Sequence, residues 1–209
     1  MMRIKSLSPN PDRAGRYRVF FEDDSVLRLY RQTVQDFGLY SGMELSVEEL
    51  KKLKVAAEEM SAKMRAVRIV AASSVSKKDL EHRLIQKGEK PQQAKAAVAW
   101  MSDLSLIDDE KTAEQIVNRC ISKGYGLNRA KQALYEKRIP KEYWEKALSD
   151  YPDQIEKIMD YLESHLEDNS SDKDKKRCID ALLRRGHSYG NIRRCMERLS
   201  FDSEDFPED

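Results

Sequence analysis

Six basic residues recur at two fixed positions around three glycines, Gly88, Gly124 and Gly186. One basic residue stands directly before each glycine and another stands seven residues after it: Lys87, Lys123 and Arg185, then Lys95, Lys131 and Arg193. Cationic side chains in a repeated arrangement suit an acidic protein surface or a phosphate backbone. The sequence therefore indicates charge-based binding, repeated along the chain.

The two series differ in how easily a local explanation accounts for them. A cation directly before a helix-ending glycine is stabilised by the negative end of the helix dipole, so the first series has a structural reason to exist. The second series falls inside predicted helices and has no such reason, so we expect an outward-facing row. The same surface is predicted to be extended by Arg129, Arg194 and Arg198.

The sequence indicates no catalytic, cofactor-binding or metal-binding site. The chain has no phosphate-binding glycine loop, dinucleotide fingerprint, zinc-ligand histidine pair or nucleophile elbow. Asp108 and Asp109 adjoin a predicted helix start, which favours capping over metal binding. The three cysteines, Cys120, Cys178 and Cys195, occupy apolar or small positions of a repeat and are expected to be buried thiols. We expect no catalysis, no cofactor and no bound metal.

The elements that must position the cations are helix pairs. Around each glycine the same apolar template recurs, with apolar residues eight and four positions before it and at three, six and ten positions after it. This spacing predicts an amphipathic helix, a left-handed glycine cap and a second helix. Such pairs bury their apolar faces by stacking, so we predict a mainly α protein of tandem three-helix, helix-turn-helix-like repeats forming an elongated, curved body.

Ahead of the repeats, two β-prone runs at 17–21 and 26–30 predict a short hairpin. A long helix is expected after Ser46, which forms a capping box with Glu49. Further on, helices are predicted to begin at Pro140 and at Pro152, the latter with Leu166 on its inner face. The predicted divisions are 1–45 (hairpin and short helix), three helical repeats at 46–107, 108–150 and 151–200, and an acidic tail at 201–209.

Composition fits a folded and water-exposed protein. Of the 209 residues, 36% are charged and 40% are hydrophobic, and the mean hydropathy is −0.75. No membrane-length apolar run or signal-peptide core is present, so we expect a cytoplasmic protein that does not contact membranes. The net charge of +1 conceals two basic blocks, 111–141 and 173–198, which flank an acidic block at 142–172.

Several motifs resemble the family of the regulatory protein RecX, the bacterial modulator of the RecA recombinase. The resemblance extends from about residue 17 to 199 and rests on four stretches: Phe37, Gly38, Leu39 and Gly42; Leu106, Ile107, Asp108, Asp109, Glu110 and Ala113; Lys123 to Gly126; and Leu183 to Gly186 with Ser188 and Tyr189. Thr112 and Arg138 depart from the family pattern. Thr112 is expected to weaken packing, and Arg138 puts a left-handed turn in doubt because its Cβ makes that conformation costly.

The resemblance implies a non-enzymatic, monomeric binder in the helical groove of the RecA filament on single-stranded DNA. It implies inhibition of ATP hydrolysis and strand exchange, with roles in recombination, DNA repair and the SOS response, and weak direct DNA contact. An alternative from another class is a direct DNA-binding helix-turn-helix regulator, for which the basic helices argue. Against it stand the near-zero net charge and the acidic block, which would repel phosphates. A generic helical scaffold for an unrelated protein is the third possibility.

Overall fold

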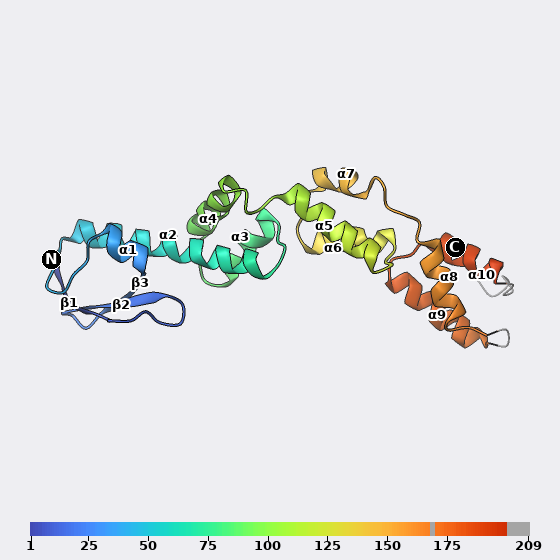
Figure 1. Ribbon diagram of the computed structural model, residues 1–209, viewed down its shortest axis with the longest axis horizontal. Helices are drawn as coiled ribbons and strands as arrows, with labels where there is room; N and C mark the ends of the chain where they lie inside the picture. Colours follow the sequence, from blue (N-terminus) through green and yellow to red (C-terminus); the bar gives the residue numbers. More distant parts are fainter. Residues whose placement is uncertain (168–169, 200–209) are drawn as a thin grey trace. The chain divides into compact units, whose positions relative to one another are not determined.

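The computed structural model describes residues 1–167 and 170–199, so the predicted tail at 201–209 lies outside the described residues. Two compact units divide at Ile107 and Asp108 (Figure 1). The first contains β1 (Met2–Leu7), β2 (Arg16–Phe21), β3 (Val26–Tyr30), α1 (Arg31–Asp36), β4 (Glu44–Leu45), α2 (Val47–Ala72), α3 (Lys77–Gln86) and α4 (Pro91–Asp103). The second contains α5 (Asp109–Ser122), α6 (Leu127–Glu136), the 3-10 turn η1 (Lys141–Tyr143), α7 (Trp144–Leu148), α8 (Ile155–Glu163), α9 (Asp172–Arg184) and α10 (Tyr189–Arg198).

The predicted hairpin is present as β2 and β3, but it belongs to a larger antiparallel sheet. The strand order is β3-β2-β1-β4, and β1 pairs Ile4 with Phe21 before a bulge shifts the register. The strands β1 and β4 were not predicted from the sequence. Two additional strands resolve the marginal stability of an isolated hairpin, because Ile4 and Leu45 add buried apolar side chains to it.

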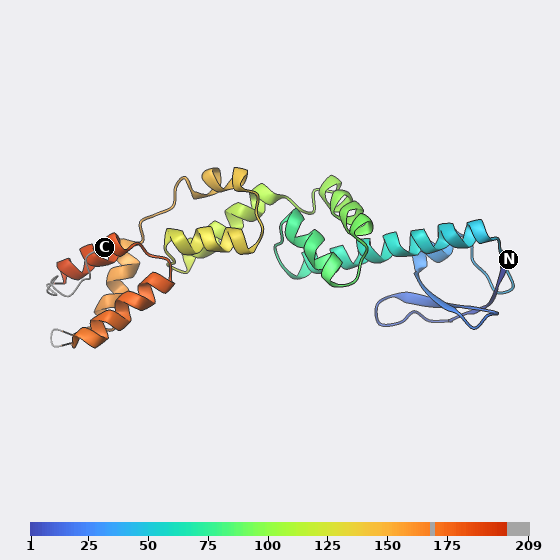
Figure 2. The ribbon, with the colours of Figure 1, turned by 180° about the vertical axis from the view of Figure 1, so that it is seen from behind.

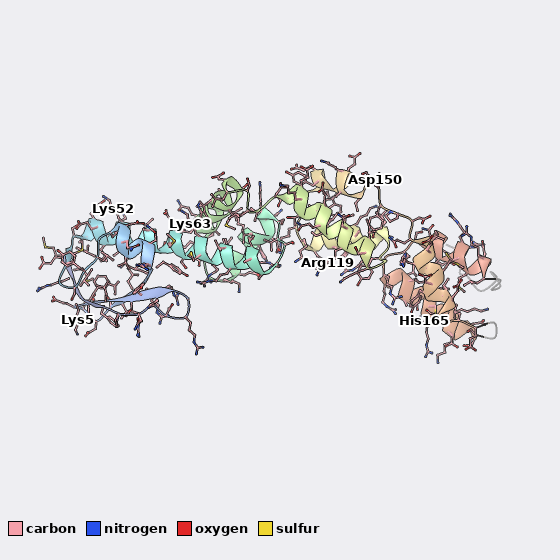
Figure 3. The ribbon with its side chains drawn as sticks, in the orientation of Figure 1. Lys5, Lys52, Lys63, Arg119, Asp150 and His165 are labelled. Atoms are coloured by element: carbon pink, nitrogen blue, oxygen red, sulfur yellow. The ribbon has the colours of Figure 1, made fainter. Side chains whose placement is uncertain are left out.

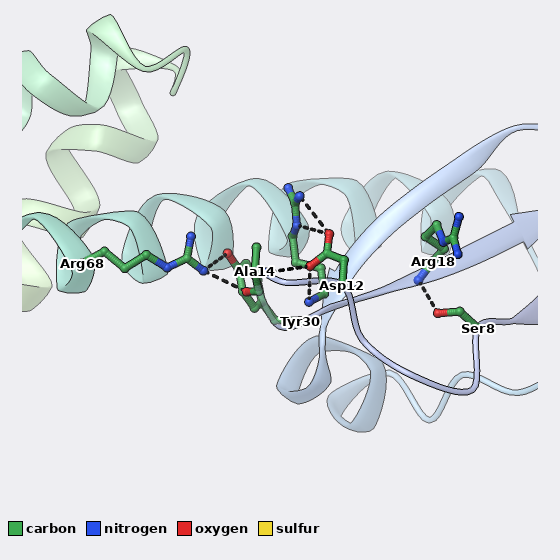
Figure 4. Close-up of polar contacts among 7 residues, drawn as sticks. Ser8, Asp12, Ala14, Arg18, Tyr30 and Arg68 are labelled. Carbon is green, nitrogen blue, oxygen red and sulfur yellow. Dashed lines mark hydrogen bonds and ion pairs between the residues drawn. The ribbon is translucent and has the colours of Figure 1, made fainter.

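The long helix α2 supports this sheet. Its start is the predicted capping box: Ser46 Oγ accepts from the Glu49 amide, and the Glu49 carboxylate accepts from the Ser46 amide. Leu53 is fully buried against the sheet core. Further along α2, Arg68 donates to the Ala14 carbonyl at 2.8 Å and to the Tyr30 hydroxyl at 3.0 Å (Figure 4). These bonds tether the β1–β2 loop and the end of β3 to the helix.

The rest of the described core consists of three further clusters, each contributed by helices close in sequence. The C-terminal part of α2 packs with α3 and α4, which lie beside it in Figure 2. In the second unit, α5, α6 and α7 share one cluster and α8, α9 and α10 share another. The mainly α fold with N-terminal strands is thus confirmed, while the finer boundaries at 46–107, 108–150 and 151–200 stay a prediction.

Helix-ending glycines behave as the repeated template predicts. Gly88, Gly124 and Gly186 have φ angles of +90°, +65° and +86°, and each follows directly on a helix C-cap residue. The second helices of the three pairs begin where the template places them, at Pro91, Leu127 and Tyr189. Local residue choice therefore specifies each helix-turn-helix pair.

Pro152, Arg138 and Thr112 each carried a local structural prediction. The helix predicted from Pro152 instead begins at Ile155, because Gln154 adopts a left-handed conformation (φ +58°) and turns the chain. It also ends at Glu163, so Leu166 is buried in the same cluster from beyond the helix rather than on its inner face. Arg138 does form the left-handed turn (φ +54°), and its amide donates to the Tyr135 carbonyl. Thr112 is buried, and its hydroxyl donates to the Asp108 carbonyl at 2.7 Å, so no polar group is left unpaired there.

Candidate cationic binding surfaces

A backbone contact joins two parts of the second unit and positions the cations around it. The N-terminal turn of α6 faces the turn that ends α9: the Gly126 amide donates to the Arg185 carbonyl at 2.9 Å, and the Asn128 amide donates to the Gly186 carbonyl at 3.1 Å. Helix starts leave amides unpaired and helix ends leave carbonyls unpaired, so this contact satisfies both. We call this contact, formed by Gly126, Asn128, Arg185 and Gly186, the glycine junction.

Beside the glycine junction, two predicted site residues from different helix pairs line one groove. Lys123 ends α5 and Arg185 ends α9, yet both line a groove together with Tyr125 and Tyr161. The Arg185 guanidinium carbon lies 4.0 Å from the centroid of the Tyr161 ring. Lys123 Nζ lies 5.9 Å from the centroid of Tyr125. No ion pair joins either cation to a carboxylate within residues 1–167 and 170–199.

The same groove contains charged residues that the sequence analysis did not single out. Lys157 and Asp160 on α8 line it and form an ion pair of 3.5 Å. Lys157 falls in the acidic block at 142–172, where two scattered lysines gave no signal. Among the side chains that line the groove, three are cations and one is a carboxylate, and the C-terminal ends of α5, α8 and α9 partly offset this excess. The groove therefore retains a small positive charge, which suits an anionic group on a partner.

Two polar side chains, the partly buried Tyr151 and the buried His187, lie near the glycine junction. The Tyr151 hydroxyl donates to the Tyr125 carbonyl at 2.6 Å, and burial raises the pKa of Tyr151 to about 12. The His187 side chain is 3% exposed and lines the groove. Burial lowers the pKa of His187, the hydrogen bond with the Gly124 backbone raises it, and nearby Arg185 lowers it further. His187 is therefore held neutral beside the glycine junction at pH 7.

This arrangement predicts an acid-sensitive second unit. Because the pKa of folded His187 lies below the ordinary value of 6.5, its contribution to stability is present above pH 6.5 and is lost as the pH falls through the folded-state pKa. We expect the urea midpoint to fall between about pH 7.5 and about pH 5.5, and to fall less in His187→Gln. His165→Gln, at an exposed histidine, is the control and should keep the wild-type slope. Identical slopes in all three proteins would contradict the assignment.

The second series of cations is exposed on the second helices. Lys95 lies on α4 in the first unit, and Lys131 and Arg193 lie on α6 and α10 in the second. Arg193 is not fully available, because its Nε donates to Glu197 Oε1 at 3.0 Å. No ion pair of Lys95 or Lys131 occurs within the described part of the chain. The arrangement of these three residues in one row that faces a partner stays a prediction.

The remaining predicted residues differ in availability. Arg129 pairs with Glu136 at 3.1 Å, and hydrogen bonds from Gln132 and then from Arg129 hold the pKa of Glu136 below its usual value. Arg194 and Arg198 are exposed on α10. Arg129 therefore requires a competing anion to release it, whereas the two α10 arginines are open to solvent.

The cysteines are free and buried as predicted, and burial raises the pKa of all three thiols. Asp108 caps α5 by accepting from the Glu110 and Lys111 amides, which supports the capping interpretation of that aspartate. Within residues 1–167 and 170–199, no group of three or more His, Cys, Asp or Glu side chains is placed to hold a metal ion. Nor is any described helix long and apolar enough to cross a membrane.

The fold and these surfaces define a class, a modular protein of three-helix units with cation-bearing second helices. Comparison with known proteins agrees: the family model for the second three-helix domain of RecX matches residues 108–148, which contain α5, α6 and α7. The regulatory protein RecX of Clostridioides difficile (strain 630) is 26% identical over 97% of this chain and 97% of its own length. The RecX of Clostridium perfringens (strain SM101 / Type A) is 24% identical over 96% of this chain and 97% of its own length.

Solved structures show the same fold. One crystal structure of regulatory protein RecX matches with a TM-score of 0.63 and 17% identity, over 94% of this chain and all of the other. The structure of RecX from Lactobacillus salivarius matches with a TM-score of 0.59 and 23% identity, over 69% of this chain and 98% of the other. The family model, the curated relatives and the fold of the solved structures thus all support assignment of the chain to the RecX family of regulatory proteins.

Proposed function

We propose that this protein is a non-enzymatic regulator that binds RecA and its filament on single-stranded DNA. By lying in the helical groove of the filament, it obstructs duplex DNA and the movements that accompany ATP hydrolysis. It thereby inhibits ATPase and strand exchange and modulates recombination and DNA repair. The proposal places a cofactor-free monomer in the cytoplasm, where RecA acts.

One observation carries the proposal. Lys123 and Arg185, which stand in two stretches that resemble the RecX family, come from different helix pairs and line one groove without carboxylate partners among the described residues. Cations that are held on aromatic rings rather than neutralised by the protein's own acids remain available to an acidic surface or a phosphate. This supports a binding role for the second unit, in a chain whose curated relatives are named regulatory proteins.

The direct test uses the cognate RecA. DNA-dependent ATP hydrolysis and strand exchange are measured with and without a molar excess of the protein, and we expect both rates to fall several-fold. The protein alone should hydrolyse no ATP. RecA rates that are unchanged by the excess would refute the proposal.

A control separates this function from direct DNA binding. The double variant Lys123→Glu with Arg185→Glu should lose inhibition, whereas Lys141→Glu with Lys176→Glu, at two exposed positions of the same unit, should keep it. A second experiment, pull-down from lysate with and without nuclease, identifies the partner. Capture of RecA after nuclease treatment supports the proposal, and capture of DNA alone supports a DNA-binding regulator instead.

A further inference from the structure

The outer face of the N-terminal sheet carries a feature that the proposed function does not use. Val19 and Leu29 are fully buried toward α2, so alternate residues of β2 and β3 face the other way. On that outer face Arg18 is paired across the strands with Arg28, and Phe20 is paired with Val26. We call these four residues the sheet-face cluster.

The two arginines oppose each other without neutralisation. Both are exposed, and like charges directly opposite in an antiparallel pair destabilise it. Other cations of the sheet have acidic partners, since Arg3 pairs with Glu22 and Lys5 pairs with Asp24. No ion pair of Arg18 or Arg28 occurs in residues 1–167 and 170–199. Acidic side chains therefore neutralise the other cations of the sheet, whereas Arg18 and Arg28 remain available to bind an external anion.

Protection of a sheet edge accounts for a charge on Arg28, because β3 is an edge strand, but it does not account for Arg18. Basic residues often blunt edge strands, but the strand order makes β2 an inner strand between β3 and β1. Its backbone is hydrogen-bonded on both sides, and the Arg18 amide also donates to Ser8 Oγ at 2.9 Å (Figure 4). A charge on Arg18 is therefore not needed to prevent strand addition at β2.

An apolar platform lies beside the charges. The Arg18 guanidinium carbon is 5.7 Å from the centroid of Phe20, which confirms that both side chains share the outer face. Phe20 is half-buried and Val26 is 47% exposed. Proteins that bind single-stranded nucleic acid combine cations that follow the phosphates with an aromatic ring on which a base stacks. An acidic peptide would use the arginines but would gain little from the ring.

We infer that the sheet-face cluster binds single-stranded nucleic acid, with a phosphate bridging Arg18 and Arg28 and a base stacked on Phe20. Paired arginines are suited to phosphate because each guanidinium donates several hydrogen bonds in one plane. A stacked base would explain why the partly exposed ring of Phe20 adjoins the charges. This site lies in the first unit, apart from the groove of the second, and it does not depend on binding to RecA.

The test uses the full chain without RecA. Fluorescence anisotropy of a labelled oligothymidylate is measured at low salt (about 50 mM), with oligouridylate and a duplex of equal length as further arms. We expect both single strands to bind more tightly than the duplex. Arg18→Gln with Arg28→Gln should weaken binding about tenfold or more, and Phe20→Leu about fivefold. The salt slope should fall by about 0.7 for each phosphate that the variant no longer neutralises.

A matched control removes an equal number of positive charges from the helix side of the first unit. Lys51 and Lys52 are exposed on α2, and Figure 3 shows Lys52 on the helix side and Lys5 at the sheet. Lys51→Gln with Lys52→Gln should bind within about twofold of wild type. Circular dichroism verifies the fold of every variant. Equal weakening by both double variants, unchanged binding of Phe20→Leu, or competition by polyglutamate as strong as by unlabelled oligonucleotide would overturn the inference.

Discussion

Replacing Gly126 with alanine is expected to destabilise the second unit by about 3 to 5 kcal/mol. The added Cβ would overlap the Gly186 carbonyl group and the His187 amide nitrogen, all of them backbone atoms that cannot rotate away. Relief requires separation of α6 from the end of α9, which breaks both hydrogen bonds of the glycine junction. Backbone strain does not contribute, because Gly126 has a φ of −75°, which alanine adopts freely.

Urea unfolding followed by circular dichroism measures the change, and hydrogen exchange at the Asn128 amide reports the junction directly. Gly190→Ala is the matched control in α10, where no heavy atom lies within 4 Å of the added Cβ. It should be neutral or stabilising by up to about 1 kcal/mol. Gly88→Ala should cost only the strain of φ +90°, about 1 to 2 kcal/mol. A Gly126→Ala protein as stable as Gly190→Ala, with Asn128 still protected, would show that the junction does not form.

Reversing Lys95, Lys131 and Arg193 to glutamate is expected to weaken binding to the RecA filament about 10- to 100-fold. The estimate assigns about 0.5 to 1 kcal/mol to each exposed cation that meets an acidic or phosphate group. Salt dependence should flatten, by a slope of about 0.7 for each single-stranded phosphate that is no longer neutralised. Stability should change little, since exposed substitutions alter it by about 0.5 kcal/mol or less. Affinity is measured by anisotropy on filaments assembled with a non-hydrolysable nucleotide.

An ion pair of Arg193 on α10 calls for a second version of this triple variant. Arg193 pairs with Glu197, so Arg193→Glu also places two carboxylates one turn apart. A second triple variant with Arg193→Gln removes that repulsion and should bind in the same weakened range. The matched control reverses three other exposed lysines, Lys78, Lys141 and Lys176, and makes an equal change in net charge. If both sets of reversals weaken binding equally, the effect is one of net charge and the row has no special role.

The sequence was most informative where structure is decided within one helical turn. Ser46 and Asp108 cap helices as expected, because a cap joins a side chain to an amide two or three residues away. The left-handed glycines follow from the same local rule. The expectation that a proline begins a helix failed at Pro152, because the left-handed Gln154 intervenes before α8. Nothing in the local pattern indicated that turn.

What the sequence could not determine depends on partners far away along the chain. The strand β1 alternates apolar and basic residues only over its first four positions, which is short for a strand signal, and its pairing partners β2 and β4 lie elsewhere along the chain. Lys123 and Arg185 were predicted individually, but their shared groove exists because Gly126 and Gly186, 60 residues apart, bring two backbones into contact. Helix pairs, caps and charge blocks are properties of neighbours in sequence. The binding surfaces were decided by tertiary packing, since close backbone approach depends on the fit of two helices that no local pattern records.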